Sequence, residues 1–161
     1  MGDRARNIAR AVEALAAHEV RVARQSSLYE TEPVDMQSKS WFLNCVIEVE
    51  TDLAPQQLMQ ALLEIERSLG RNRAIAPDNA GASRSPKESR TIDIDILFFG
   101  ATIVSMPELE IPHPRMAGRR FVLVPFAEIA PGVRHPVLKK AIAELLLATS
   151  DRSRVRHMGT N

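Results

Sequence analysis

The chain has 161 residues, which is enough for one ordinary domain with its own hydrophobic core. Its apolar fraction of 45% and charged fraction of 25% are those of globular proteins and exclude a disordered or fibrous chain. Because 21 Lys and Arg nearly balance 20 Asp and Glu, the net charge of +1 gives no support for nucleic acid as a partner.

Cysteine content and hydropathy indicate a cytoplasmic setting. The single cysteine, Cys45, cannot form an internal disulfide, and its apolar neighbours predict a buried side chain rather than a nucleophile. No apolar stretch approaches the ~20 residues that cross a bilayer. Residues 1–6 carry acidic and basic side chains with no hydrophobic run after them, unlike a signal peptide. We therefore expect a reducing, cytoplasmic environment and no membrane partner.

The first predicted elements are a helix and a strand. Asp3 can cap a helix whose apolar residues recur at helical spacing up to about His18. The alternation of residues 19–24 then predicts a strand that runs on to about Tyr29. Residues 31–33 end this strand, because the residue before a proline is conformationally restricted and proline lacks a backbone donor.

A second strand, a second helix and a long loop follow. Aromatic and β-branched residues predict a strand over 41–50. Pro55 suits the first turn of a helix, and Gly70 suits the position just past its end. Residues 71–89 are low in hydrophobicity, and so long a loop inside a compact domain is typical of disorder or of a mobile lid over a site.

The second half of the chain alternates short strands and helices. Residues 91–99 have the highest apolar density and predict a strand, with a short hairpin partner at 102–104. Helices are predicted over 119–129 and around 138–146, and the polar tail 151–161 is expected to be frayed. Since most loops are too short for crossovers, this order favours a single α+β domain over a doubly wound α/β fold.

The predicted strand at 91–99 carries two carboxylates on one face. Because side chains alternate along a strand, Asp93 and Asp95 point away from the face formed by the neighbouring isoleucines, with backbones roughly 6–7 Å apart. Such a pair can bind one Mg²⁺ each, or share a pair of ions, beside phosphate oxygens. A solvated polar face is the simpler alternative, but aspartate is a poor strand former, so we favour a metal site.

Three other candidates have structural explanations of equal or greater weight. Phe42 and Asn44 share one face of a predicted strand and could stack on and hydrogen-bond a flat heterocycle, although an aromatic residue beside a sheet-edge amide is equally plausible. His113 lies in a proline-rich turn followed by arginines, which suits phosphate contact, but such histidines are more often structural. Glu66 is by default a solvated helix residue.

Blocks of sequence spread over most of the chain resemble one enzyme family. They are Ser26–Val34 (SSLYETEPV), Phe42–Asn44 (FLN), Ile65–Glu66 with Gly70–Arg73 (GRNR), Arg90–Leu97 (RTIDIDIL), Ile111–Met116 (IPHPRM), Arg119–Leu123 (RRFVL) and Glu128–Pro131 (EIAP). In this order they resemble the 6-hydroxymethyl-7,8-dihydropterin pyrophosphokinases of folate biosynthesis. The RTIDIDIL and FLN blocks together are quite specific.

The resemblance implies a ferredoxin-like α+β sandwich, a mostly antiparallel sheet with helices packed on it. It also implies transfer of a pyrophosphoryl group from the co-substrate ATP to the hydroxymethyl oxygen of the pterin, assisted by two Mg²⁺ on Asp93 and Asp95. The other roles that it implies are ATP contacts at Glu66, Ile96, His113 and Arg119, pterin contacts at Thr31, Val34, Phe42, Asn44 and Phe121, and catalytic arginines at Arg71, Arg73 and Arg90. The resemblance also implies a monomer.

The chain departs from the family pattern in two places. Family members have a strand ending in G-S-N before the G-D-R that here follows Met1 directly. We favour a start codon that was assigned too late. The alternatives are a natural short form, in which another segment or chain takes the place of the missing strand, and a degenerate paralogue. An open sheet edge would permit self-association. The family's R-W-G-P-R reads Pro86–Arg90 (PKESR), which places lid closure in question.

The residues and the resemblance together favour an ATP-dependent pterin pyrophosphokinase. The leading alternative is a degenerate member of the family that binds pterin or nucleotide without transferring. From the chemistry of the residues alone, a two-metal phosphohydrolase is a third reading.

Overall fold

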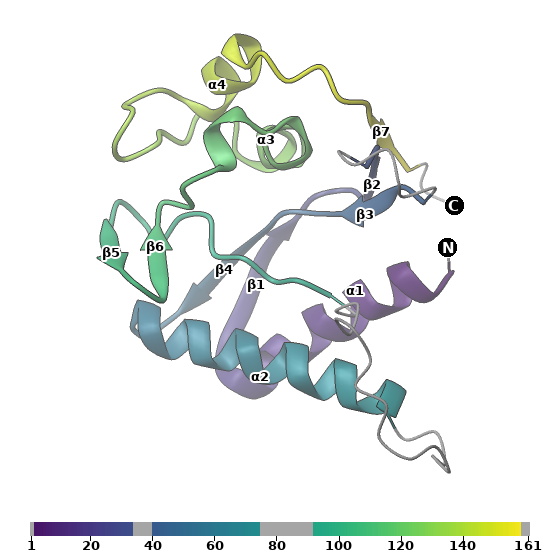
Figure 1. Cartoon of the computed structure of the whole chain (residues 1–161). Coiled ribbons are helices and arrows are strands. Elements are labelled where there is room, and N and C mark those ends of the chain that lie inside the picture. The colour runs from purple at the N-terminus through teal and green to yellow at the C-terminus, as the bar shows by residue number, and fades with distance from the viewer. Residues whose placement is uncertain (1, 34–39, 75–91, 159–161) are drawn as a thin grey trace. The chain divides into compact units, whose positions relative to one another are not determined.

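A computed structural model describes residues 2–33, 40–74 and 92–158 of the chain (Figure 1). It contains α-helices together with antiparallel pairs of β-strands, which confirms the α+β class. The chain divides into two compact units, one made of residues 1–20 and 51–95 and the other of residues 21–50 and 96–161. Among the described residues, no helix is both long and apolar enough to span a membrane.

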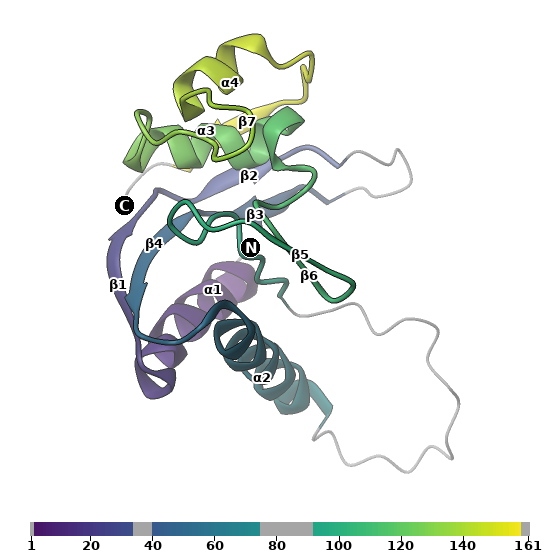
Figure 2. The ribbon, with the colours of Figure 1, turned by 90° about the vertical axis from the view of Figure 1, so that its left-hand side faces the viewer.

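The first unit is built on two helices that pack against each other, α1 (Gly2–Leu15) and α2 (Pro55–Ala74) (Figure 2). Helix α1 starts at Gly2, so Asp3 lies within its first turn and does not cap it from outside as predicted. A 3₁₀ turn (Ala16–His18) follows α1. The two helices bury their apolar stripes, which consist of Ala11, Leu15, Leu58, Ala61, Leu62, Ile65 and Leu69.

The prediction that α2 ends at Gly70 is wrong, because the helix continues to Ala74. A glycine inside a helix costs about 1 kcal/mol relative to alanine but does not by itself stop the helix. Arg71 and Arg73, expected at the start of a mobile loop, therefore lie on the last turn of α2. The rest of that predicted loop, with the altered PKESR block and Arg90, lies outside the described residues.

The strands of the chain form short ladders. Strand β1 (Val20–Gln25) pairs with β4 (Ile47–Thr51), and β2 (Tyr29–Thr31) pairs antiparallel with both β3 (Phe42–Asn44) and β7 (Val155–His157) (Figure 1). The sequence predicted one long strand where β1 and β2 lie, and another where β3 and β4 lie.

Both of the predicted long strands are interrupted in the structure, at the point where Ser26 and Val46 face each other. The Ser26 N–H donates to the Val46 carbonyl, and the Val46 N–H donates to the Ser26 hydroxyl oxygen, each over 2.9 Å. A side chain thus replaces one backbone partner of the ladder, and both strands break there. The local alternation of residues does not indicate that a side chain takes the place of a backbone acceptor here.

The prediction of a strand over 91–99 is wrong for the described residues 92–99, which belong to no helix or strand. A strand requires a ladder of backbone bonds to a neighbour, but two backbone groups here have other partners. The Ile94 N–H donates to the Glu66 carboxylate, and the Leu97 carbonyl accepts from the His113 N–H at 2.9 Å. The predicted alternation of side chains is confirmed, since Asp93 and Asp95 are exposed between half-buried isoleucines.

The predicted hairpin partner of that segment pairs elsewhere. Strand β5 (Val104–Met106) pairs antiparallel with β6 (Leu109–Ile111), which is joined to it by only two residues. Closing so short a connection costs little chain entropy, so the local pairing is available without the segment 92–99. The turn predicted after Phe99 does form, because the Thr102 N–H donates to the Phe99 carbonyl.

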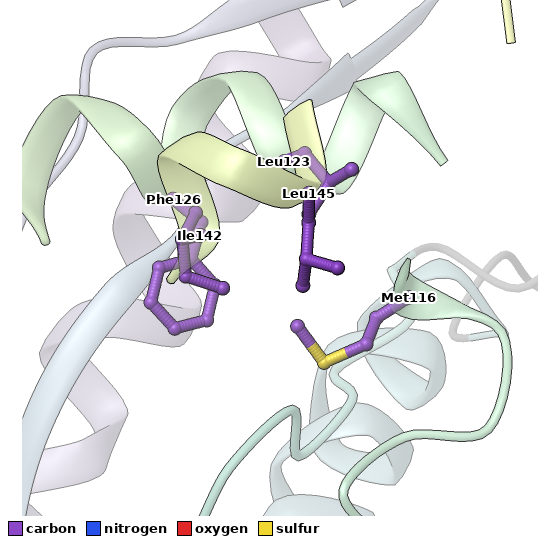
Figure 3. Packing of buried hydrophobic residues seen from close by; sticks show 5 residues of the cluster. All are labelled: Met116, Leu123, Phe126, Ile142 and Leu145. Carbon is purple, nitrogen blue, oxygen red and sulfur yellow. The ribbon is translucent and has the colours of Figure 1, made fainter. Parts of the chain in front are cut away.

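The core of the second unit lies between its helices. A 3₁₀ turn (Met116–Gly118), α3 (Arg120–Ile129) and α4 (Ile142–Ala148) bring together one apolar cluster (Figure 3). Its buried members are Met116, Leu123, Phe126, Ile142 and Leu145. Helix α3 also packs against β2, β3 and β7.

Helix α4 begins later than predicted. The His135 Nδ1 accepts from the backbone N–H groups of Val137 and Leu138, at 3.2 and 3.0 Å, and so holds these residues in a turn. Leu138, predicted as part of the apolar stripe, is therefore exposed. The helix starts at Ile142, which is fully buried.

The prediction of a frayed tail from residue 151 is wrong for the described part of it. The Asp151 carboxylate accepts from the N–H groups of Arg120 and Ser153, at 2.9 and 2.8 Å, and ties the tail to the start of α3. Strand β7 then completes the sheet on the free edge of β2. A polar composition did not reveal this pairing, because an edge strand tolerates polar residues on both faces.

Candidate active site

The two aspartates lie on either side of a backbone group that α2 holds. Glu66 is half-buried, and its Oε1 accepts from the Ile94 N–H at 2.7 Å. The residue before it, Ile65, is 1% exposed and anchors this turn of α2 in the core of the first unit. The segment bearing Asp93 and Asp95 is thus fixed at its midpoint, while both carboxylates stay exposed.

This arrangement suits a cation that is shared with a bound phosphate. Among the residues that the structure describes, no group of three or more His, Cys, Asp or Glu side chains could by itself hold a metal. Mg²⁺ is commonly bound by only one or two carboxylates, with substrate phosphates and water completing its six ligands. The exposed oxygen pair of Asp93 and Asp95 fits that mode, and it does not fit a closed structural metal site.

Three residues predicted to contact a heterocycle come together on β2 and β3. Thr31 lies opposite Phe42 in the ladder, and the Asn44 Nδ2 donates to the Thr31 Oγ1 at 2.9 Å. Phe42 is 53% exposed, although it is a large aromatic residue. The site therefore combines an exposed ring with an amide whose orientation is set by a buried hydroxyl. Val34, also predicted for this site, lies outside the described residues.

Phe121, the second aromatic predicted for this site, lies in the first turn of α3, the helix that packs against β2 and β3. It is half-buried, and the Arg119 guanidinium lies 5.5 Å from its ring centroid. At this distance a guanidinium is attracted to the ring face. The contact places a positive charge beside the aromatic residue.

His113 presents one particular nitrogen to its surroundings. Its Nδ1 accepts from the Arg115 N–H at 3.2 Å, so the proton of a neutral ring is on Nε2, which can donate to a phosphate oxygen. Its own N–H holds the Leu97 carbonyl. The neighbouring Ile96, predicted as an ATP contact, is half-buried.

Cys45 was predicted to be buried and not a nucleophile. It is half-buried, and burial raises the pKa of its thiol, which disfavours the reactive thiolate. It therefore plays no part in the chemistry considered below.

Sequence reasoning gave no role to Glu128, which links α3 to the strands. Its carboxylate accepts from the Ser27 N–H, the Ser27 hydroxyl and the Tyr29 hydroxyl, at 2.5, 2.7 and 3.1 Å. Burial alone would raise the pKa of Glu128, but the bonds from Ser27 and Tyr29 and the charge of His157 lower it below the ordinary value. Burial and the bond to Glu128 raise the pKa of Tyr29.

The blocks that contain these residues were visible in the sequence, but their contact was not. Ser27 and Glu128 are 101 residues apart, and no local pattern predicts a bond over that separation. The bonds of Glu128 hold the start of β2, and with it Thr31, against the helix that carries Phe121.

Comparison with known proteins decides the family. Residues 1–131 match the family model of 7,8-dihydro-6-hydroxymethylpterin-pyrophosphokinase. The chain belongs to this family. It is 39% identical over 130 residues to the 2-amino-4-hydroxy-6-hydroxymethyldihydropteridine pyrophosphokinase of Bacillus subtilis, covering 80% of this chain and 72% of that protein. It is 38% identical over 150 residues to the protein of the same name in Methylorubrum extorquens, covering 90% and 87%.

A longer relative contains the same region. The folic acid synthesis protein fol1 of Pneumocystis carinii is 37% identical over 143 residues, which make up 89% of this chain but only 18% of that protein. Pyrophosphokinases are transferases that use ATP, so the family places this chain among the ATP-dependent transferases. The match of residues 1–131 includes every candidate site residue named above.

Proposed function

We propose that the chain transfers the pyrophosphoryl group of ATP to the hydroxymethyl oxygen of 6-hydroxymethyl-7,8-dihydropterin, a step of folate biosynthesis. The observation that carries this proposal is the family match over residues 1–131. The chemistry of the described side chains supports it, because exposed carboxylates, an exposed aromatic ring and an oriented amide are the groups that such a reaction needs.

Asp93 and Asp95 are the proposed ligands of two Mg²⁺ that would neutralise the ATP phosphates. Phosphoryl-type transfer depends mainly on positioning and on stabilising charge, with little covalent chemistry by the protein. Two exposed carboxylates on a segment held by Glu66 supply the oxygen ligands for this purpose. Arg71, Arg73 and Arg90 are the proposed catalytic arginines on the sequence resemblance alone.

Phe42, Asn44, Thr31 and Phe121 are the proposed pterin contacts, with Val34 added from the resemblance. A pterin is a flat ring with donors and acceptors along one edge. An exposed phenylalanine can stack on its face, while the Asn44 amide, whose Nδ2 is already bound to Thr31, offers its oxygen to a ring N–H or amino group.

Glu66, Ile96, His113 and Arg119 are the proposed ATP contacts. A neutral His113 has its proton on Nε2 and can donate to a phosphate without a change of charge. Arg119 brings a permanent positive charge beside Phe121.

One experiment separates this proposal from the alternatives. The chain is incubated with ATP, Mg²⁺ and 6-hydroxymethyl-7,8-dihydropterin, and the nucleotide products are separated by chromatography. Formation of AMP that requires the pterin supports transfer. Release of ADP or phosphate indicates a hydrolase, and binding of pterin or nucleotide without a product indicates a degenerate family member.

A pair of variants tests the metal ligands in the same assay. Asp95→Asn is expected to lower the rate by more than about 100-fold, because it removes a charged ligand from the site where phosphate charge must be neutralised. Asp52→Asn, which changes an exposed aspartate before α2, is the matched control and should leave the rate unchanged. Full activity of Asp95→Asn would show the metal assignment to be wrong.

A further inference from the structure

We propose that Arg156 is a positioning residue for the pterin site. From the C-terminal strand β7 it holds Trp41, and through Trp41 it fixes the start of the strand that carries Phe42 and Asn44. The inference rests on the proposed function, since it takes that strand to be the pterin-binding strand. The family-model match ends at residue 131 and assigns nothing to β7.

The register of the three-stranded sheet shows which residues lie on each of its two faces. Glu30 on the central strand β2 lies opposite Leu43 on β3 and opposite Arg156 on β7. Paired residues in a ladder lie on the same face, and neighbours along a strand lie on opposite faces. Arg156 is therefore on one face of the sheet, and the proposed pterin contacts Phe42 and Asn44 are on the other.

Arg156 spans this sheet from one edge strand to the other. Its Nη2 lies 3.0 Å from the Oε2 of Glu30, and its guanidinium carbon lies 4.0 Å from the centroid of the Trp41 ring. The Glu30 side chain is only 10% exposed. A buried carboxylate thus fixes the guanidinium from one side, so that its flat face is presented to the indole.

Trp41 is the residue immediately before β3, and its position matters because β3 is short. The strand has only three residues and lies at the edge of its sheet. So short an edge strand gains few ladder bonds, and a side-chain contact at the residue just before it helps to order it. An aromatic residue that is already in its bound position loses less entropy when a ligand stacks on it.

The rest of β7 is held without the Arg156 side chain. The Glu32 N–H donates to the Arg154 carbonyl at 3.1 Å, and the Met158 N–H donates to the Leu28 carbonyl at 2.9 Å. The His157 ring meets the Tyr29 ring edge-on at 5.4 Å. Removal of the guanidinium should therefore leave β7 paired and the chain folded.

The test is Arg156→Ala, with two dissociation constants measured by calorimetry. The first is that of 6-hydroxymethyl-7,8-dihydropterin, with Mg²⁺ and a non-hydrolysable ATP analogue at saturation, and the second is that of the ATP analogue alone. We expect the pterin to bind about fivefold to tenfold more weakly, as the loss of a partly shielded cation–π contact predicts, and the analogue to bind unchanged. Arg154→Ala, which removes the same charge two residues earlier, is the control and should change neither.

Two further variants separate the contact with Trp41 from the cost of leaving Glu30 unpaired. Glu30→Gln combined with Arg156→Ala removes the buried charge together with its partner, and Trp41→Leu leaves the ion pair intact. Both should show the same selective loss of pterin affinity as Arg156→Ala. Hydrogen exchange of the amides of residues 42–44 should be faster in all three than in the wild type.

The outcomes distinguish this inference from the function on which it rests. If the wild-type chain does not bind the pterin, the proposed function fails and the positioning role fails with it. If the wild type binds the pterin and Arg156→Ala binds it equally well, or loses pterin and analogue affinity alike, the positioning role alone is overturned.

Discussion

Glu66 offers the sharpest test of how the carboxylate segment is held. In Glu66→Ala, the Ile94 N–H loses the acceptor that it has at 2.7 Å. A hydrogen bond to a charged group contributes about 1.5–3 kcal/mol, and partial burial reduces this, so we expect the free energy of unfolding to fall by about 1–2 kcal/mol. Glu66→Gln keeps an uncharged acceptor and should lose about half as much.

The loosened segment should also bind metal less well. A partner that orients a metal ligand typically contributes tenfold or more to metal affinity, so the Mg²⁺ concentration for half-maximal AMP formation should rise about tenfold in Glu66→Ala and less in Glu66→Gln. The direct contact of Glu66 with ATP that is proposed above predicts, in addition, a higher KM for ATP at saturating Mg²⁺. The two roles are separated by titrating Mg²⁺ and ATP in turn.

The assays are urea unfolding followed by far-ultraviolet circular dichroism, and a Mg²⁺ titration of AMP formation. Glu64→Ala is the matched control, because Glu64 lies two residues earlier on α2 and its exposed carboxylate lies 3.7 Å from the His18 Nδ1. That variant should match the wild type in both assays. If Glu66→Ala kept wild-type stability and wild-type Mg²⁺ dependence, the reasoning from the Ile94 bond would be refuted.

Three further predictions concern stability. The pKa of Glu128 is lowered in the folded chain, so the unfolded chain binds more protons in acid. The stability that this carboxylate contributes above about pH 4.5 should therefore be lost as the pH falls below that value. Glu128→Gln should flatten this part of a profile of urea midpoint against pH. Asp151→Ala removes the acceptor at the start of α3 and should cost about 1 kcal/mol in urea unfolding, whereas an undiminished midpoint would contradict a stabilising role of this bond. Leu123→Ala in the core should cost about 2–5 kcal/mol, and Leu147→Ala, at an 86% exposed position, less than about 0.5 kcal/mol; equal losses would contradict the assignment of the core.

Much of the fold could be predicted from local patterns. The α+β class, the helix at 119–129 and the apolar stripe of α2 follow from periodicity alone. The failures at residues 92–99 and in the tail share one physical cause, since each depends on a partner distant in the sequence. Residues 92–99 have the composition of a strand, but two of their backbone groups bond to Glu66 and His113 and form no ladder. The polar tail pairs with β2 because that strand offers an open edge.

The candidate site divides in the same way. The alternation that exposes Asp93 and Asp95, and the shared face of Phe42 and Asn44, depend only on neighbours in sequence and were predictable. The bond from Ser27 to Glu128 and the contact of Arg156 with Trp41 join residues about a hundred positions apart, which no local pattern contains. For residues 34–39 and 75–91, which include Val34 and Arg90, the roles implied by the resemblance remain predictions.

The most direct test of the central claim is to follow the phosphorus atoms of ATP through the reaction. The chain is mixed with ATP, Mg²⁺ and 6-hydroxymethyl-7,8-dihydropterin, and the products are identified by ³¹P nuclear magnetic resonance. Transfer of an intact pyrophosphoryl group predicts AMP and a pterin diphosphate ester in equal amounts, with both requiring Mg²⁺ and both lost in Asp95→Asn. Appearance of ADP with a pterin monophosphate, or of free phosphate without any pterin ester, would contradict it.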